Sequence, residues 1–193
     1  MTKTKKVVRT IVVAGVLCSL AAIATFSAFT SQADNPDNNV TAGTVTLADN
    51  DSDTAMYSMG NAKPGDSVTK CIKVDYTGTL DADVKFYSPS TIGSLGQYVN
   101  LQVEPGTQSG TPAAGDCTGF TADGGNLFNN TLNNLPTTYA GGVSDNPGTT
   151  ATKWVNGDSV AYRVTATLSA STPDSAQGGT TNSHDLVWES RNQ

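Results

Sequence analysis

The sequence has few of the side chains on which most enzymes depend. Among 193 residues there are one histidine and three cysteines, and charged residues make up only 15% of the chain. A classical hydrolase mechanism or a zinc site would have to work through that one imidazole. So little charge also argues against a helical bundle or coiled coil and favours short strands and turns. Catalysis is therefore the harder hypothesis to support.

Acidic residues are absent from the N-terminus, where none precedes Asp34. The first ten residues hold four of the 11 basic ones, so the rest of the chain has seven basic and 17 acidic residues and a net charge of −10. Such an acidic body repels nucleic-acid phosphates and anionic lipid headgroups. We therefore expect no nucleic-acid partner.

A run without any charge follows the basic residues and extends from Ile11 to Ala33. A positive cluster, an apolar stretch and then small residues are typical of a secretory signal peptide. Cleavage after Ala28 would make residues 1–28 the signal peptide, and cleavage after Ala33 is the alternative. The run is also long enough to remain as an uncleaved membrane anchor. We expect a secreted or cell-surface protein that meets the membrane only through this segment.

Export determines how the cysteines are interpreted. Cys18 lies inside the signal peptide, so the mature chain keeps Cys71 and Cys117. Two cysteines in an oxidising compartment most simply form one disulfide, and closing a loop of this length stabilises the fold by roughly 4 kcal/mol. The alternative is a pair of buried thiols.

Apolar and polar residues alternate with a period of two along most of the chain, as in half-buried β-strands. The clear runs are 68–76, 80–86, 99–103 and 160–168, and the weaker ones are 44–47, 55–59 and 186–188. The first two runs are separated by only Thr77–Thr79, which predicts a hairpin. Seven or so short strands broken by turn residues predict an all-β fold, a two-sheet β-sandwich.

The remaining segments are expected to connect these strands. Residues 105–126 and 141–152 are rich in Gly, Thr and Asp and are predicted to be loops. Apolar residues at helical spacing within 126–135 predict one short helix in an insertion. Gly-Asp-Ser-Val occurs at residues 65–68 and again at 157–160, each time where an alternating run begins. We interpret this repeat as turn chemistry shared by two facing sheets.

Four short motifs follow one another between residues 20 and 85. They are Ala-Thr-Phe-Ser-Ala-Phe at 24–29, Val-Thr-Ala-Gly-Thr-Val-Thr-Leu at 40–47, Asn-Ala-Lys-Pro-Gly-Asp-Ser-Val-Thr-Lys at 61–70 and Thr-Gly-Thr-Leu at 77–80. Their order and spacing resemble the TasA/camelysin family of bacterial exported proteins, which a dedicated SipW-type signal peptidase processes. Residues 175–178 and 187–189 are similar to the C-terminal end of actinobacterial members. No motif covers residues 87–152.

The resemblance implies a jelly-roll-like sandwich that assembles into extracellular or cell-surface fibres of the biofilm-matrix type. In that family an N-terminal segment of one subunit completes a sheet of the next, so the partner is a second copy of the chain. By position, the donor segment is 29–47, with Phe29, Val40 and Val45 as anchors, and the sandwich domain is 48–193. On the residues alone, this segment would be the first strand of its own sandwich. The resemblance also favours cleavage after residue 28.

Camelysin members have been described as metalloproteases, which makes a metal site the alternative to a purely structural role. There is no His-Glu-x-x-His motif, and the one histidine is His184. A zinc site would therefore consist of His184 and carboxylates alone, an unusual set for a hydrolase. We expect no catalytic residue and no cofactor, and we place His184 in a loop before the last strand.

Two further binding sites remain open. Asp49, Asp51 and Asp53 alternate like the start of a calcium loop, although the Gly and Glu that an EF-hand needs are missing from their places. A solvated acidic turn is the simpler interpretation of these residues. Three aromatic residues also leave open a secreted adhesion or carbohydrate-binding module, although aromatics in a sandwich usually belong to its core. They are Trp154, Trp188 and Phe120.

Overall fold

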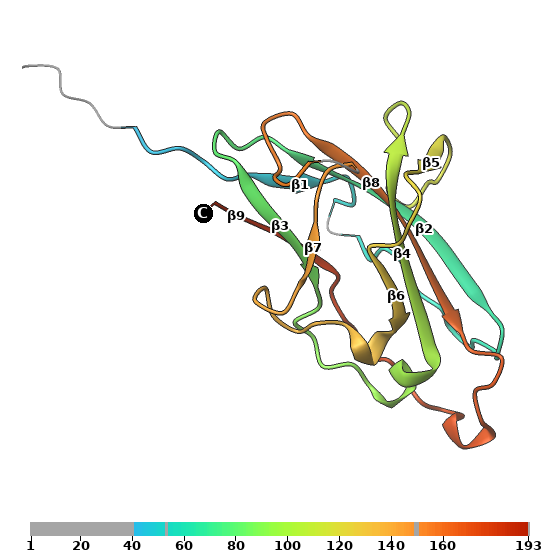
Figure 1. The fold of residues 1–193 in the computed structure, drawn as a ribbon. Coiled ribbons are helices and arrows are strands. Elements are labelled where there is room, and N and C mark those ends of the chain that lie inside the picture. The colour runs from blue at the N-terminus through green and yellow to red at the C-terminus, as the bar shows by residue number, and fades with distance from the viewer. Residues whose placement is uncertain (1–40, 53, 149–150, 193) are drawn as a thin grey trace, which may run out of the picture. The chain divides into compact units, whose positions relative to one another are not determined.

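Two antiparallel sheets make up the fold, which is known from a computed structural model that describes residues 41–52, 54–148 and 151–192 (Figure 1). The strands are β1 Leu47–Asp49, β2 Ser67–Tyr76, β3 Ala82–Tyr87, β4 Val99–Gln108, β5 Phe120–Ala122, β6 Phe128–Thr131, β7 Val143–Asp145, β8 Ser159–Leu168 and β9 Val187–Asn192. The larger sheet has the order β1-β2-β8-β4-β5, with β6 also paired to β4, and the smaller one has the order β7-β3-β9. The prediction of an all-β, two-sheet sandwich is confirmed.

Helical structure is limited to single turns in the described part of the chain. The 3₁₀ helices are η1 Ser94–Tyr98, η2 Leu132–Asn134 and η3 Asp174–Ala176. Within the same residues, no helix is long and apolar enough to cross a membrane.

The core lies between the sheets, on the strand faces that the alternation predicted. In β8 every second residue from Val160 to Leu168 is buried, and in β3 the buried side chains are those of Ala82, Val84 and Phe86. Each large apolar side chain removed from water contributes about 1.5–3 kcal/mol to stability. Because side chains alternate across a strand, the period of two placed these residues on the inner face without any knowledge of the topology.

The predicted hairpin of residues 68–76 and 80–86 is wrong, because β2 and β3 belong to different sheets. β2 pairs with β1 and β8, whereas β3 pairs with β7 and β9. The short connection passes from one sheet to the other, and its N–H groups at Thr77 and Thr79 donate to the carbonyl oxygens of Thr46 and Thr44. With these groups satisfied, the connection crosses the edge of the core without forming a hairpin turn.

Several weakly patterned segments also differ from expectation. The predicted strand at 55–59 is an irregular segment, whereas the predicted loops at 105–126 and 141–152 contain β5, the end of β4 and β7. In the expected helix at 126–135, four residues form β6 and only η2 is helical. β6 pairs with β4 and buries Phe128, so tertiary pairing outweighs the local helical spacing.

The repeated Gly-Asp-Ser-Val sequence forms two equivalent turns at opposite ends of β2 and β8. These strands are neighbours in one sheet, so the repeat does not mark two facing sheets. Gly65 and Gly157 have φ values of 97° and 94°, which glycine adopts at low cost. The Gly65 N–H donates to the Leu168 carbonyl at the end of β8, and the Gly157 N–H donates to the Tyr76 carbonyl at the end of β2. Each turn thus fastens the end of the neighbouring strand.

The predicted disulfide joins Cys71 to Cys117, at a sequence separation of 46. Cys71 lies in β2, and Cys117 lies in the loop before β5. The Gly115 N–H also donates to the Cys71 carbonyl oxygen at 3.0 Å. The bridge therefore holds the loop that contains Gly115 against β2.

We expect the double variant Cys71→Ala/Cys117→Ala to lose about 4 kcal/mol of unfolding free energy, because the unfolded chain regains the entropy of an open loop. Urea denaturation of the variant and the oxidised protein measures this difference. Equal midpoints and slopes for the two proteins would contradict a stabilising bridge.

Candidate functional site

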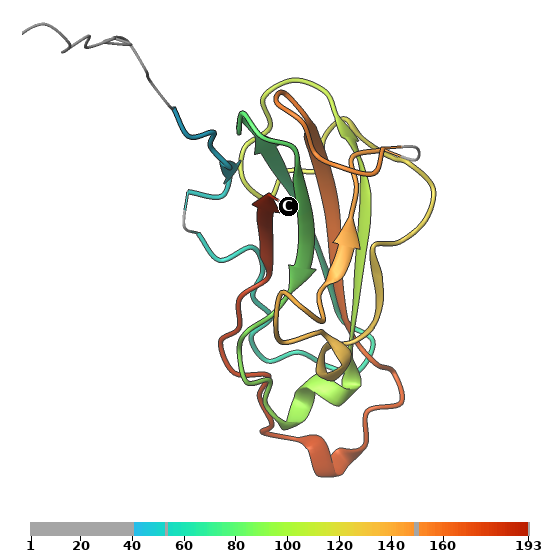
Figure 2. The same cartoon turned by 60° about the vertical axis from the view of Figure 1, so that its left-hand side comes forward.

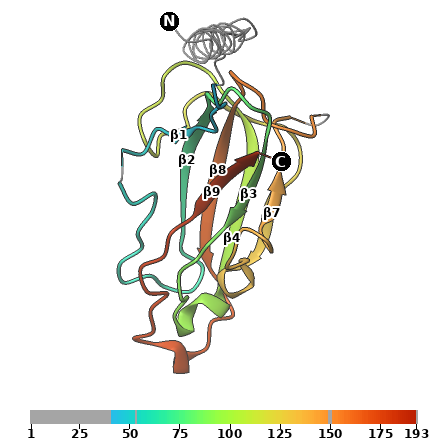
Figure 3. The ribbon, with the colours of Figure 1, turned by 90° about the vertical axis from the view of Figure 1, so that its left-hand side faces the viewer.

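A groove of about 970 Å³ runs along one side of the sandwich, between an edge of each sheet. One wall is formed by β1 and the segment that follows it, and the other by residues 179–186 and the start of β9 (Figure 3). The floor consists of core side chains from the larger sheet and from the 3₁₀ turns η1 and η2, which are Ile72, Val74, Leu95, Val99, Leu132 and Leu168. The groove therefore gives access to the apolar interior.

The sheet edges beside the groove are incompletely paired. Figure 2 shows β9, β3 and β7 side by side, and β9 pairs with β3 alone within the described residues. On the other wall, β1 pairs with β2 over only three residues, from Leu47↔Tyr76 to Asp49↔Val74. Exposed strand edges present N–H and C=O groups that can pair with another strand.

Residues 55–62, here called the strap, form part of the groove wall that follows β1. Met56, Tyr57, Met59 and Ala62 are partly buried and pack against the core. No backbone–backbone hydrogen bond joins the strap to another described residue. The strap is therefore held by side-chain contacts, in contrast to the strands around it.

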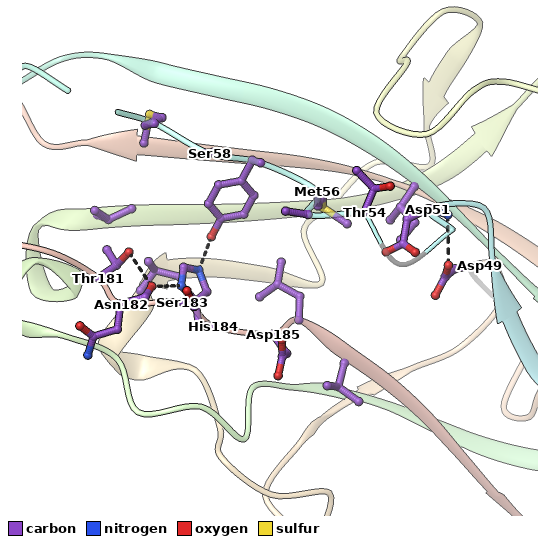
Figure 4. A pocket seen from close by; sticks show the side chains of 18 of the residues that line it. Asp49, Asp51, Thr54, Met56, Ser58, Thr181, Asn182, Ser183, His184 and Asp185 are labelled. Atoms are coloured by element: carbon purple, nitrogen blue, oxygen red, sulfur yellow. Dashed lines mark hydrogen bonds between the residues drawn. The ribbon is translucent and has the colours of Figure 1, made fainter. Parts of the chain in front are cut away.

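The side chain of His184 connects the strap to the opposite wall (Figure 4). Its Nδ1 lies 3.0 Å from the Asn182 carbonyl oxygen and its Nε2 lies 2.7 Å from the Tyr57 hydroxyl oxygen. Since a carbonyl oxygen only accepts, Nδ1 carries the proton and Nε2 accepts from Tyr57. Burial raises the pKa of Tyr57 well above its ordinary value, which keeps the hydroxyl a donor. Both imidazole nitrogens are thus engaged.

The acidic turn considered as a calcium site lines the groove at the end away from His184 (Figure 4). The Asp49 carboxylate accepts a hydrogen bond from the Asp51 N–H at 3.1 Å, and Asp53 lies outside the described residues. Asn50 fixes the turn to β2, because its side-chain oxygen accepts from the Lys73 N–H at 2.9 Å. In the described residues, no group of three His, Cys, Asp or Glu side chains could hold a metal ion. Calcium binding stays a prediction.

The predicted donor segment lies only partly within the described residues. The signal peptide, both cleavage sites and the anchors Phe29 and Val40 fall outside them. Val45 is partly buried and packs against the core. Because 44–46 accept bonds from the chain after β2 and residues 47–49 form β1, residues 44–49 act as the first strand of their own sandwich.

The aromatic residues considered for sugar binding have other surroundings. Trp154 is fully buried, and its indole N–H donates to the Asp145 carbonyl oxygen at 2.9 Å. The Trp188 ring lies 4.7 Å from that of Tyr162, which is buried. The Phe120 ring lies 4.9 Å from the guanidinium carbon of an arginine in β8. The two tryptophans thus pack with the core and do not form an exposed platform.

Sequence patterns gave no indication of a buried carboxyl group at Asp145. Only 3% of this residue is exposed, and its carboxylate accepts a hydrogen bond from the Tyr162 hydroxyl. Burial raises the pKa of Asp145 to about 7, although the hydrogen bond from Tyr162 opposes this shift. The group is therefore poised to bind a proton between mildly acidic and neutral pH.

We expect this proton to make the fold more stable at mildly acidic pH. The folded-state pKa of Asp145 is about 7 and its ordinary value is 3.8, so the folded state binds more protons than the unfolded state between these values. The contribution of Asp145 to stability is about 4 kcal/mol at most below pH 4, decreases as the pH rises to 7 and is absent above.

Unfolding free energies of Asp145→Asn, measured from pH 4 to 7, should lack this decrease, because the amide does not titrate. Asp123→Asn, a change at an exposed carboxylate, is the control and should retain it. A slope in Asp145→Asn equal to that of the unmodified protein would show that Asp145 is not the titrating group.

A comparison with known protein families finds a match in the N-terminal half of the chain. The family model described as camelysin metallo-endopeptidase matches residues 2–95. This match confirms the resemblance of these residues to the TasA/camelysin family. The match includes β1, β2, β3 and the strap, and it ends before β4, β9 and His184. No curated protein matches the chain.

The camelysin description implies a metal ion, which the described residues do not fit. A catalytic zinc site needs three protein ligands and an open position. No such group of side chains occurs in the parts of the chain that the structure describes. His184 lies outside the family match, and both of its ring nitrogens take part in hydrogen bonds.

Proposed function

We propose that this chain is an exported structural protein whose copies assemble into extracellular or cell-surface fibres, each groove receiving a strand from the next copy. The observation that carries the proposal is the groove, which has an apolar floor and lies between the short β1 and the edge of β9 that has no partner strand among the described residues. An added strand would pair its backbone with a sheet edge and place alternate side chains in the groove. The match of residues 2–95 to the camelysin family model supports the same role.

The donor strand is assigned to residues 29–35. Residues 44–49 already belong to their own sandwich, so the donor must precede them. Pro36 cannot donate to a strand ladder, which limits the donor to the seven residues after the proposed cleavage site. Seven extended residues span about 23 Å, long enough to follow the six residues of β9. Phe29 is the one large apolar side chain in this stretch.

Head-to-tail donation explains why assembly would produce fibres. Each copy gives a strand at one place and receives one at another, and such a contact propagates unless its rotation closes a ring. After removal of residues 1–28 the net charge is −10, so copies repel one another at long range. A specific contact at short range is then needed for association.

Purified chain beginning at Phe29 should form filaments visible by electron microscopy. Chain beginning at Thr41 should stay monomeric, because it keeps the compact unit that starts at Ala42 and loses the donor strand. Phe29→Ala should raise the concentration needed for assembly roughly tenfold or more, the effect of exposing one large apolar anchor.

Sedimentation over a wide concentration range measures each of these effects. A Phe29 chain that remains monomeric, or a Thr41 chain that still forms filaments, would contradict donor-strand assembly.

The family description favours a second candidate, a metallo-endopeptidase. This candidate predicts casein hydrolysis that persists through repurification and disappears with a chelator and in His184→Ala. Hydrolysis that persists in His184→Ala would rule out the one histidine as its metal ligand. Fibre formation and casein hydrolysis are measured on the same preparation. The results then distinguish a structural protein from a metallo-endopeptidase.

A further inference from the structure

We infer that the strap, residues 55–62, closes one side of the groove in the unassembled protein and that the strand of a second copy displaces it during fibre formation. The inference rests on the proposed function and concerns how its acceptor groove is kept closed. It commits to one occupant after displacement, the N-terminal segment of another copy of this chain.

The first support is the difference between the bonds that the strap makes and those that a strand would make. Side chains of the strap pack against the core, but no backbone–backbone hydrogen bond joins the strap to another described residue. β9 has six residues, of which Val187 and Trp188 line the groove, and it pairs only with β3 in that part of the chain. An incoming strand can therefore form a backbone ladder that the strap leaves unformed.

The second support is the loose filling of the groove. A space of about 970 Å³ remains between the strap and the opposite wall, far more than the small voids of a close-packed core. Met56 and Met59, which supply much of the strap's apolar contact, have flexible side chains suited to irregular spaces. Replacing these contacts disturbs little of the packing beneath them.

The third support is the backbone at either end of the strap. Ser52, three residues before the strap, and Asn61, within it, both have a φ of 54°, in the left-handed region that Asn adopts more readily than Ser. The region between them is the one predicted as a strand at 55–59, yet it is irregular. A left-handed residue on each side of this region interrupts the extended chain that a strand needs.

The hydrogen bond between the Tyr57 hydroxyl and His184 Nε2 holds the strap to the opposite wall of the groove. At 2.7 Å it is the strap's one hydrogen bond within the described residues, and it crosses the groove to the opposite wall (Figure 4). Its loss should increase the population with an open groove about fivefold, the effect of removing one typical hydrogen bond.

The methionines provide a direct reporter of the strap. The sequence has three, Met1, Met56 and Met59, so the chain beginning at Phe29 carries methionine only in the strap. Dilute hydrogen peroxide oxidises exposed methionine to the sulfoxide, and mass spectrometry gives the rate at each position. We expect both rates to rise several-fold on going from monomer to filament.

A tyrosine variant tests the hydrogen bond between Tyr57 and His184 separately. Tyr57→Phe in the Phe29 chain should shorten the lag before filaments appear, because the groove opens about fivefold more often. Tyr139→Phe is the matched control: it also removes one hydroxyl hydrogen bond, to the Asp83 carbonyl oxygen at 3.1 Å, but Tyr139 does not line the groove. Its lag should equal that of the unmodified chain.

The outcomes separate this inference from the proposed function. If the Phe29 chain forms filaments while both methionine rates and the Tyr57→Phe lag are unchanged, the strap stays in place and the inference is wrong, although donor-strand assembly stands. If the Phe29 chain forms no filaments at all, the proposed function itself fails.

Discussion

The ladder formed by β2, β8 and β4 holds the rest of the sandwich in place. β2 pairs with β8 from Ser67↔Thr167 to Asp75↔Ser159, and β8 pairs with β4 over a similar length. The inner face of this ladder supplies most of the buried side chains, and its outer face carries the disulfide to the loop before β5. The smaller sheet has only three strands, so it covers this face incompletely and leaves the groove along one side.

This incomplete cover connects the fold to the proposed role. A sandwich that closed both edges with long strands would be more stable as a monomer and would have nowhere to accept a strand. Among the described residues, one edge strand has three residues, the outer edge of β9 has no partner strand, and the strap beside them makes no backbone pairing. The acidic surface limits unspecific association, which is the usual hazard of an open edge.

The sequence predicted those parts of the fold that depend on local alternation. The inner residues of β8 and β3, and the bridge between Cys71 and Cys117, follow from period and composition. Alternation does not say which sheet a strand joins, which is why a hairpin was expected between strands that lie in different sheets. β7 is too short and polar to show a pattern, and it forms because β3 offers it a partner.

The candidate site was less predictable for the same reason. His184 and the acidic turn were singled out by residue type, but the contact between Tyr57 and His184 joins residues 127 positions apart. Nor does any local pattern mark Asp145, whose burial depends on Tyr162 in another sheet. Contacts between distant segments are decided by topology, and the topology could not be deduced from alternation alone.

The central claim, that the groove accepts a strand from another copy, is tested most directly by a filament structure at a resolution that traces the backbone. The account predicts that residues 29–35 of one copy lie extended in the groove of the next, hydrogen-bonded along β9, with residues 55–62 of the receiving copy outside it. Filaments in which the β9 edge has no strand from a neighbour, and each groove keeps its own residues 55–62, would contradict it.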